Sequence, residues 1–370
     1  MNNIGLYLHV PFCKSKCGYC DFYSLCGNSA KYDEYTSALQ KRILFFGERF
    51  SRAVDSVYFG GGTPSVLEGD RIAELLETVK MAFSLSENAE ITLEANPADN
   101  LFKTLEKAKK AGVNRLSLGV QSGVEEELEI LGRRHKNADV IRTISDARKV
   151  GIDNISLDLM LGIPNQTIES LDKSIDFVLS FNPSHISAYI LKIEEGTPFS
   201  KIKSDLNLPS EEETAEMYLH TVKRLEGAGF FQYEISNFSK KGFESRHNLK
   251  YWHLDEYLGL GPAAHSFMEG KRFFFPRSTE EFICGCEPVF DGEGGTEEEF
   301  IMLSLRLRKG LCESLLFEKY GIKPTEEYKK FTERLISVGY AKRQGDRLAL
   351  TPKGFLVQNE IITELYERLI

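Results

Sequence analysis

The sequence has no long apolar run and no surplus of positive charge. Its 370 residues carry 46 Lys and Arg against 55 Asp and Glu, a formal net charge of −9 at pH 7. Proteins that neutralise a phosphate backbone present a basic surface, so nucleic acid is not an expected partner. The first residues, MNNIGLYLHVPFC, contain neither an Arg-rich leader nor a run long enough for a signal peptide or a membrane span. We therefore expect a cytoplasmic protein.

Cysteines are few, and their odd number of seven does not suggest a disulfide framework in a reducing compartment. Three of them, Cys13, Cys17 and Cys20, lie within the stretch PFCKSKCGYCDF. Thiolates four and three residues apart on one loop wrap an iron–sulfur cluster more naturally than a tetrahedral zinc ion that lacks a fourth ligand. A [4Fe-4S] cluster held by three thiolates keeps one iron open for chemistry. Zinc is the alternative, with Cys26 completing the ligands.

Short apolar runs alternate with helical patterns from the first residues onward. Six runs of strand length and β-forming composition lie at 6–10, 56–60, 90–95, 115–120, 154–160 and 185–191. Helices are expected between them, at 33–50, 67–83, 101–111, 137–150 and 168–180. This alternation predicts an α/β fold with a parallel sheet, a partial (βα)6 barrel with fewer units than the eight that close a full barrel. The segment FQYEISNFS at 231–239 predicts one more strand.

The pattern changes toward the C-terminus. We expect a barrel domain with its linker at 1–280 and a small helical, winged-helix-like domain at 281–370. In the second domain an amphipathic helix from about residue 290 precedes a helix, two short strands with a turn at Gly345–Asp346, and a last helix. Many modules of this shape bind DNA. Here Lys and Arg are balanced by Glu and Asp, which favours a structural or docking role.

Polar residues stand where the expected strands end. The segment GGGTP at 60–64 follows the second strand, and Glu94, Gln121 and Asp158 end the third, fourth and fifth. Loops at the carboxyl ends of parallel strands build the active site of α/β barrels, so we expect these residues and the cysteine loop on one face. For each residue alone, a helix cap or a solvated loop is the alternative. Together they predict a ligand shell.

The cysteine loop after a first strand, followed by GGGTP and these strand ends, resembles the radical S-adenosylmethionine (SAM) superfamily over roughly residues 4–270. The resemblance implies that the amino and carboxylate groups of SAM chelate the open iron, and that an electron from the reduced cluster cleaves the sulfonium to a 5′-deoxyadenosyl radical. Tyr7 and Tyr19 match positions that flank the cluster and the adenine, with core packing as the alternative for Tyr7. The residues implied in SAM binding are Tyr7, Tyr19, Gly61, Gly62, Thr63, Glu94, Gln121, Arg133 and Asp158.

The same resemblance implies a role for each polar side chain. Glu94 and the GGGTP segment hold the SAM amino group. Gln121 and Asp158 hold the ribose hydroxyls. Arg133, in the segment LGRRH, holds the carboxylate of SAM through a forked ion pair.

The segments YLHVPFC, GGGTP, LGVQS, GRRH and DLMLGIPNQT are together most similar to the coproporphyrinogen-oxidase-like group of that superfamily. One branch, the oxygen-independent coproporphyrinogen III oxidases, has another cysteine two residues after the third, where this chain has Phe22. The other branch, the HemW-type haem chaperones, resembles this chain in CGYCDF and in the hexapeptide HNLKYW at 247–252. The chaperone branch is the closer resemblance, and the oxidase is the alternative.

The chaperone resemblance implies a protein that binds haem besides a [4Fe-4S] cluster and SAM, and delivers the haem to acceptor proteins, membrane respiratory enzymes among them. It favours haem transfer over porphyrinogen oxidation, so no catalytic residue is assigned. It is also compatible with a homodimer. His247 offers an imidazole for haem iron, and Tyr251 and Trp252 offer flat surfaces for the macrocycle. A hydrogen-bonded loop anchor is the alternative role of His247, and His253 and His265 are competing ligands.

Overall fold

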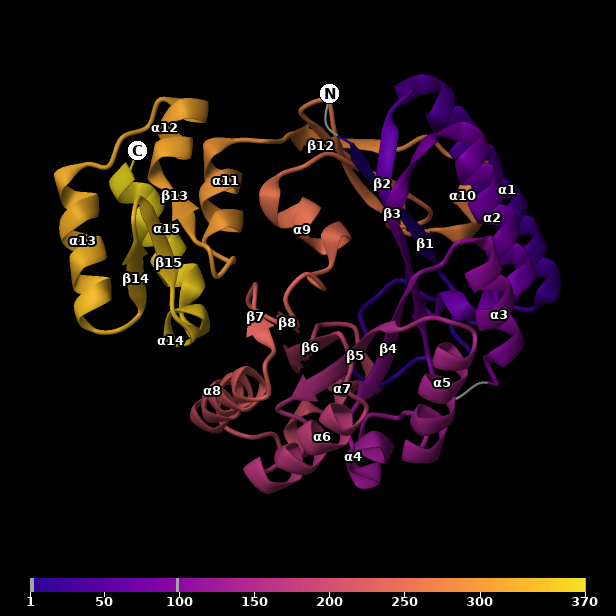
Figure 1. Cartoon of the computed structure of the whole chain (residues 1–370), viewed down its shortest axis with the longest axis horizontal. Helices are drawn as coiled ribbons and strands as arrows, with labels where there is room; N and C mark the ends of the chain where they lie inside the picture. The colour runs from indigo at the N-terminus through magenta and orange to yellow at the C-terminus, as the bar shows by residue number, and fades with distance from the viewer. Residues whose placement is uncertain (1–2, 98–99, 370) are drawn as a thin grey trace.

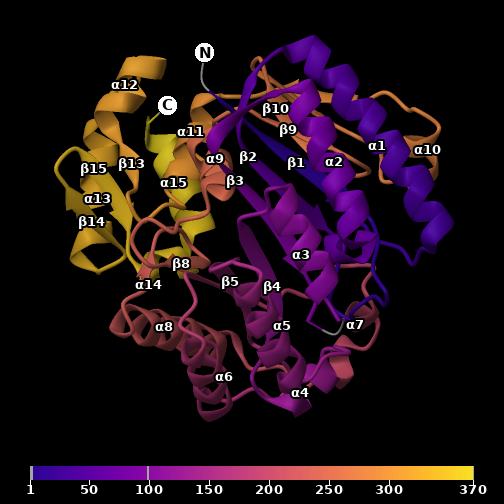
Figure 2. The ribbon, with the colours of Figure 1, turned by 45° about the vertical axis from the view of Figure 1, so that its right-hand side comes forward.

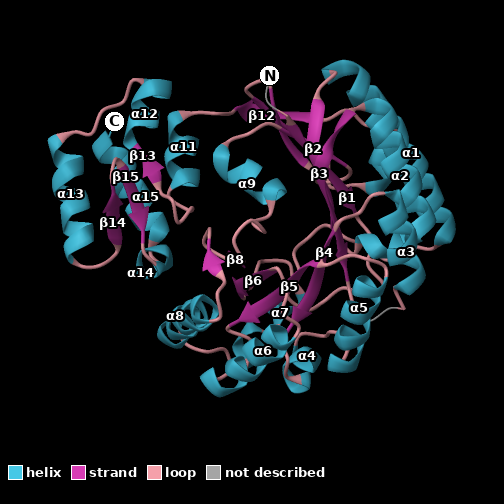
Figure 3. Cartoon of the chain, in the orientation of Figure 1, coloured by secondary structure: helices cyan, strands magenta, loops and turns pink. Residues whose placement is uncertain are grey.

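The structure is a computed structural model that describes residues 3–97 and 100–369 (Figure 1). A twelve-stranded sheet in the order β12-β11-β10-β9-β1-β2-β3-β4-β5-β6-β8-β7 runs through the larger part of the chain, and a three-stranded sheet lies in the C-terminal part (Figure 3). Within these ranges, no helix combines the length and the apolar composition that crossing a bilayer requires.

Six parallel strands form the centre of the large sheet and confirm the expected partial barrel. They are β1 (Ile4–Val10), β2 (Ala53–Gly61), β3 (Ser84–Ala95), β4 (Arg115–Gln121), β5 (Asn154–Leu161) and β6 (His185–Ile190). Each pairs in parallel with the next. The barrel stays open because β1 pairs on its other side with β9 (Tyr257–Leu260), and β6 pairs with β8 (Asn237–Ser239).

The six strands present an apolar face to the helices and a polar face to the inside of the barrel. In β1, Leu6 and Leu8 are buried in the main hydrophobic core, while Tyr7 between them lies on the opposite face. Residues paired across parallel strands share a face, and the pairing runs from Tyr7 to Tyr58 and then to Thr92. The polar residues of this inner face include Tyr7, His9, Ser56, Tyr58, Glu90, Thr92, Glu94, Arg115, Ser117, Asn154, Ser156, Asp158, His185 and Ser187.

Helices cover the outer face of the parallel strands, as Figure 2 shows. They are α1 (Ser29–Phe50), α2 (Glu68–Ala82), α3 (Phe102–Ala111), α4 (Glu125–Ile130), α5 (Asn137–Lys149), α6 (Ile168–Ser180) and α8 (Glu211–Gly227). Short helical turns lie at η1 (Pro64–Leu67), α7 (Pro198–Lys201) and η2 (Lys203–Asp205). The first helix begins four residues before its expected start at 33, because the Asn28 side chain accepts a hydrogen bond from the Lys31 amide at 3.0 Å and caps it earlier.

The segment between the barrel and the C-terminal part differs from expectation in one place. The single strand expected at 231–239 is divided into β7 (Phe231–Gln232) and β8, which pair antiparallel, because the chain turns back where the Tyr233 amide donates to the Asn237 carbonyl at 3.1 Å. The elements that follow β8, apart from β9, are α9 (Arg246–His253), β10 (His265–Met268), β11 (Lys271–Phe274), α10 (Thr279–Ile283) and β12 (Val289–Glu293).

The C-terminal unit, which we define as 297–369, has the expected helical, winged-helix-like order of elements. It contains α11 (Glu297–Ser304), β13 (Leu311–Cys312), α12 (Glu313–Tyr320), α13 (Glu326–Ser337), β14 (Ala341–Gln344), β15 (Arg347–Leu350), α14 (Pro352–Leu356) and α15 (Gln358–Leu369). Its antiparallel strands follow the order β13-β15-β14, and β14 turns into β15 at Gly345–Asp346 as predicted.

The unit is joined to the barrel by main-chain hydrogen bonds. The Ile235 amide donates to the Arg306 carbonyl at 3.2 Å, and the Arg308 amide donates to the Tyr233 carbonyl at 3.0 Å. The domain boundary expected between 280 and 281 stays a prediction. Strand β12 lies beyond that boundary but pairs with β11, so Val289–Glu293 belongs to the large sheet.

We expect Gly259→Ala to destabilise the fold, because a Cβ at this position in β9 would come within 2.1 Å of the His265 main-chain oxygen. The neighbouring backbone cannot move aside without breaking the pairing of β9 with β10, so the cost should be about 2–3 kcal/mol. Urea unfolding measures it. Gly227→Ala is the matched control, since no atom lies within 4 Å of the added methyl group there. Equal stability of both variants would contradict the assigned close approach.

Candidate functional site

A cavity of about 540 Å³ opens at the carboxyl ends of the parallel strands. Thirteen residues are expected in the cluster and ligand sites, and all of them except Tyr7 and His247 line this cavity. The expected residues in its wall are Cys13, Cys17, Tyr19, Cys20, Gly61, Gly62, Thr63, Glu94, Gln121, Arg133 and Asp158. These residues come from the first five strands and the loops after them. Parallel pairing therefore brings together residues up to 145 positions apart in the sequence.

The cysteine loop follows β1 and is tied down at both ends. The Cys13 amide donates to the Leu25 carbonyl at 3.0 Å, and the Leu25 amide donates to the Pro11 carbonyl at 2.9 Å. Cys13, Cys17 and Cys20 are free thiols that line the cavity, whereas the fourth thiol of the region, Cys26, is exposed and does not line it. Three thiols on one wall suit a cluster whose irons occupy separate corners.

The glycine segment after β2 holds this loop in place. The Gly62 amide donates to the Val10 carbonyl at 2.8 Å, and the Thr63 amide donates to the Phe12 carbonyl at 2.7 Å. A Cβ on Gly62 would lie 2.6 Å from the Phe12 carbonyl oxygen, so only glycine permits this approach. The Thr63 hydroxyl also lies 3.4 Å from the Cys13 thiol. The segment therefore positions the cysteine loop in addition to lining the cavity.

Two of the carboxyl groups in the cavity wall, those of Glu94 and Asp158, form no ion pair with a side-chain cation within the described part of the chain. The Tyr58 hydroxyl donates to Glu94 Oε1 at 2.7 Å, and the Ser117 hydroxyl donates to Asp158 Oδ1 at 3.4 Å. Burial raises the pKa of Glu94 to about 7 and that of Asp158 to about 6. A carboxyl group whose pKa lies this near pH 7 is partly protonated, and it loses its proton when a cation binds beside it. Glu94 thus fits the amino group that the resemblance assigns to it.

Arg133 offers an unused donor at the cavity wall. Its Nη2 donates to the Gly119 carbonyl at 2.6 Å and its Nη1 to the Cys17 thiol at 3.6 Å, while its Nε is buried with no hydrogen-bond partner among the described residues. A buried donor without a partner is costly, and a carboxylate can satisfy it. Gln121 lies close by with a left-handed backbone, φ 69°, a strained conformation of the kind found at ligand sites.

Tyr7 and His247 lie deeper in the barrel, away from the cavity. Tyr7 OH lies 3.1 Å from His9 Nδ1, which matches the alternative of core packing. The His247 side chain is about 1% exposed, its Nδ1 lies 2.9 Å from the Ser56 hydroxyl, and its Nε2 lies 2.8 Å from the Tyr251 hydroxyl. Burial lowers its pKa to about 3. Both ring nitrogens of His247 lie within hydrogen-bonding distance of a hydroxyl group, which is the geometry of the alternative anchor role, and haem ligation by His247 stays a prediction.

Sequence analysis missed Tyr58, which joins the two regions. Its hydroxyl bonds to Glu94, and its ring stacks on His247 with centroids 5.2 Å apart and an interplanar angle of 28°. The signal was present in SVYFG, where Tyr58 alternates with the buried Val57 and Phe59 and so must face the inside of the barrel. Lys192 and Tyr189, at the end of β6, also line the cavity and were missed.

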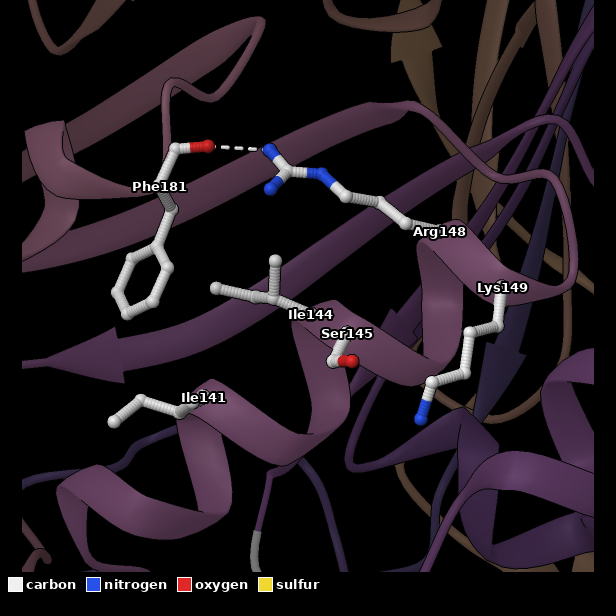
Figure 4. A pocket seen from close by; sticks show the side chains of 6 residues that line it. All are labelled: Ile141, Ile144, Ser145, Arg148, Lys149 and Phe181. Carbon is white, nitrogen blue, oxygen red and sulfur yellow. Dashed lines mark hydrogen bonds between the residues drawn. The ribbon is translucent and has the colours of Figure 1, made fainter.

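A second cavity, of about 530 Å³, lies on the outside of the barrel (Figure 4). The Arg148 guanidinium crosses it and donates to the Phe181 main-chain carbonyl. Its wall consists of Ile141, Ile144, Ser145, Arg148, Lys149 and Phe181. This wall has no metal-ligating side chain and no carboxylate, so the chemistry-bearing residues are in the first cavity.

The three cavity thiols should be the cluster ligands. We expect Cys13→Ser, Cys17→Ser and Cys20→Ser each to abolish the iron–sulfur absorption of anaerobically reconstituted protein, because serine is a poor ligand for iron in such clusters. Cys26→Ser is the matched control from the same region and should keep the absorption. Loss of the absorption in Cys26→Ser, or zinc in the purified protein, would contradict the three-thiolate assignment.

The raised pKa of Glu94 predicts a pH-dependent stability. A carboxyl group whose pKa rises on folding, here from 4.5 to about 7, stabilises the fold fully below pH 4.5, and this contribution is lost as the pH rises to about 7. In cluster-loaded protein without SAM, we expect Glu94→Gln to gain about 1–3 kcal/mol relative to the parent protein between pH 5 and pH 7.5 in urea unfolding. Glu77→Gln, at an exposed helix position, is the control. A pH-independent difference for Glu94→Gln would contradict the burial argument.

Comparison with known proteins shows which family the chain belongs to. The profile of the radical SAM superfamily matches residues 7–178, and that of the HemN C-terminal domain matches residues 298–357. The protein named heme chaperone HemW from Bacillus subtilis is 36% identical over 367 residues, covering 96% of this chain and 97% of its own length. A protein of the same name from Mycobacterium tuberculosis H37Rv is 34% identical and covers 98% of this chain and 94% of its own.

A solved structure shares the fold. The coproporphyrinogen III oxidase HemN from Escherichia coli, described as a radical SAM enzyme, superposes with a TM-score of 0.84 over 98% of this chain and 90% of its own, at 22% identity. At that identity the likeness shows the fold alone. The two relatives, by contrast, are 36% and 34% identical to this chain over alignments that cover at least 94% of each protein. The chain therefore belongs to the HemW family of the radical SAM superfamily.

Proposed function

We propose that this protein is a haem chaperone, which binds haem, a [4Fe-4S] cluster and SAM and delivers the haem to acceptor proteins. The observation that carries the proposal is the full-length similarity to proteins named heme chaperone HemW, at 31–36% identity over at least 94% of their length. The acceptors, membrane respiratory enzymes among them, are part of the proposal. A cytoplasmic location and a homodimer stay predictions.

The cavity supports the part of the proposal that concerns the cluster and SAM. A reduced [4Fe-4S] cluster supplies a single electron for cleavage of the sulfonium of bound SAM. The chain supplies Cys13, Cys17 and Cys20 as iron ligands. Glu94, whose pKa is about 7 before binding, accepts the amino group, and Arg133 Nε, which has no partner among the described residues, meets the carboxylate. Because Glu94 must lose its proton to bind an ammonium group, SAM should bind more weakly below pH 7.

The alternative function is an oxygen-independent coproporphyrinogen III oxidase, which the shared fold with HemN favours. One residue at the mouth of the cavity argues for the chaperone. Phe22 lines the cavity with 69% of its surface exposed, at the position where the resemblance places another cysteine in the oxidases. An exposed aromatic ring provides apolar contact area but no thiol chemistry.

Two assays on the same preparation separate the functions. We expect cluster-loaded protein to bind haem, seen as a new Soret band, and to pass it to apomyoglobin, an acceptor whose holo spectrum is distinct. With SAM, a reductant and coproporphyrinogen, we expect no protoporphyrinogen. Formation of protoporphyrinogen under turnover would favour the oxidase, and the absence of any haem-dependent Soret band would overturn the chaperone proposal. The protein without cluster serves as the control for cluster dependence of both readouts.

A further inference from the structure

Tyr58, in β2, bonds to a residue of the first cavity without lining the cavity itself. Its hydroxyl donates to Glu94 Oε1 at 2.7 Å, and the Gly61 main chain also bonds to the Glu94 carboxyl group. Glu94 is part of the cavity wall, whereas Tyr58 is not among the residues that line it. A ligand in the cavity therefore meets the carboxyl group, and Tyr58 acts on that ligand only through Glu94.

Close packing fixes the direction of the Tyr58 ring. One neighbour is His247 of α9, the helix that Figure 1 shows between the barrel and the C-terminal unit, with ring centroids 5.2 Å apart and an interplanar angle of 28°. Another is Tyr7, at a centroid distance of 6.2 Å. At the end of β2, a Cβ on Gly60 would lie 2.9 Å from the Tyr58 ring, so glycine leaves the room that the ring occupies. A ring held in this way presents its hydroxyl at one place.

The Tyr58 hydroxyl favours the ionised form of Glu94. Burial is the main cause that raises the pKa of Tyr58 well above 10, and the Glu94 charge adds to it, so the phenol keeps its proton and donates at every pH near neutrality. Burial raises the pKa of Glu94 to about 7, and the bond from Tyr58 is the largest of the causes that lower it. A hydrogen bond donated to a carboxylate stabilises the charged form, so losing this bond should raise the pKa of Glu94 further.

The other titratable groups that face Glu94 come from several elements. Besides burial, the charge of Asp158 in β5 raises the pKa of Glu94, and that of Arg115 in β4 lowers it. Burial raises the pKa of three further tyrosines, and the Glu94 charge adds to it, at Tyr7 of β1, Tyr189 of β6 and Tyr251 of α9. Further charged side chains in the cavity wall are Lys16, Asp21, Arg133, Lys192 and Glu194. Asp158 and Arg115 thus act on Glu94 through their charge, whereas Tyr58 bonds to it directly.

We propose that Tyr58 is a positioning residue for SAM binding, whose hydroxyl holds Glu94 Oε1 and thereby presents Oε2 as an anionic acceptor to the amino group of SAM. This inference rests on the proposed function, and it assigns the pH range of SAM binding to a residue outside the cavity wall. In neutral Glu94, the donor at Oε1 leaves the carboxyl proton on Oε2, the oxygen that the amino group needs. Binding therefore requires loss of that proton, which the bond from Tyr58 favours.

Calorimetric titration with SAM tests this role in full-length protein that carries the oxidised cluster, which has no electron to give for cleavage. We expect Tyr58→Phe, which keeps the ring and the iron–sulfur absorption, to move the midpoint of affinity against pH upward by about one pH unit. Binding should then be about tenfold weaker at about pH 6 and nearly equal to the parent at about pH 9. Tyr233→Phe removes another hydroxyl inside the barrel, bonded to His185 at 2.8 Å, and as the matched control should leave the midpoint unchanged. Equal weakening at every pH, or an unchanged affinity, would overturn the proposal.

Urea unfolding without SAM tests the contact between Tyr58 and Glu94 independently of the ligand. In the parent background, the gain in stability from Glu94→Gln should level off at about pH 7, where the contribution of the protonated carboxyl group is lost. In the Tyr58→Phe background the gain should keep rising to about pH 8, because the pKa of Glu94 in the folded state is higher. Levelling off at the same pH in both backgrounds would overturn the role of Tyr58. Absence of SAM binding by the parent protein, with this shift in unfolding present, would instead overturn the proposed function and the positioning role with it.

Discussion

The alternation of apolar and polar side chains along six parallel strands is the constraint on which the rest of this structure depends. The apolar set faces the covering helices and forms the core. The other set points into the barrel, where Arg115, two histidines and several carboxyl and hydroxyl groups are enclosed. Polar groups enclosed in this way must bond to one another, since each unsatisfied group costs free energy. The inside of the barrel is therefore a bonded polar network whose upper end is the cavity.

At the cavity end of the network, some polar groups lack an ion-pair or hydrogen-bond partner among the described residues. Among the residues that the structure describes, Glu94 has a hydroxyl donor in Tyr58 but no ion pair, and Arg133 Nε has no hydrogen-bond partner. These are the places where a ligand with an amino group and a carboxylate adds the missing partners. The cysteine loop is placed over the same cavity by the close contact between Gly62 and Phe12. The cysteine loop, held by the end of β2, and the ligand-binding groups on the following strands thus line one cavity.

At its lower end, the network is closed by α9. His247 bonds to Ser56 and Tyr251, and its main-chain amide donates to Glu90 at 3.1 Å. Tyr58 touches both ends, through Glu94 above and the ring of His247 below. A change of charge at Glu94 is therefore one aromatic side chain away from the helix that faces the C-terminal unit.

The sequence by itself determined the cysteine spacing, the order of strands and helices, and the set of residues at the strand ends, because these follow from local periodicity and from the rule that parallel strands end at one edge. The cysteines and the strand-end residues of the cavity were found in this way, whereas Tyr19 and Arg133 were expected only from the resemblance to the superfamily. The tertiary structure alone decided which histidines are buried. His247 and His253 lie on the same short helix, and no local pattern tells which face meets the barrel, since that depends on contacts with Ser56 in β2. Likewise, the C-terminal unit is joined to the barrel by main-chain hydrogen bonds of Tyr233 and Ile235 to residues 306–308, a contact between distant segments that local periodicity does not show.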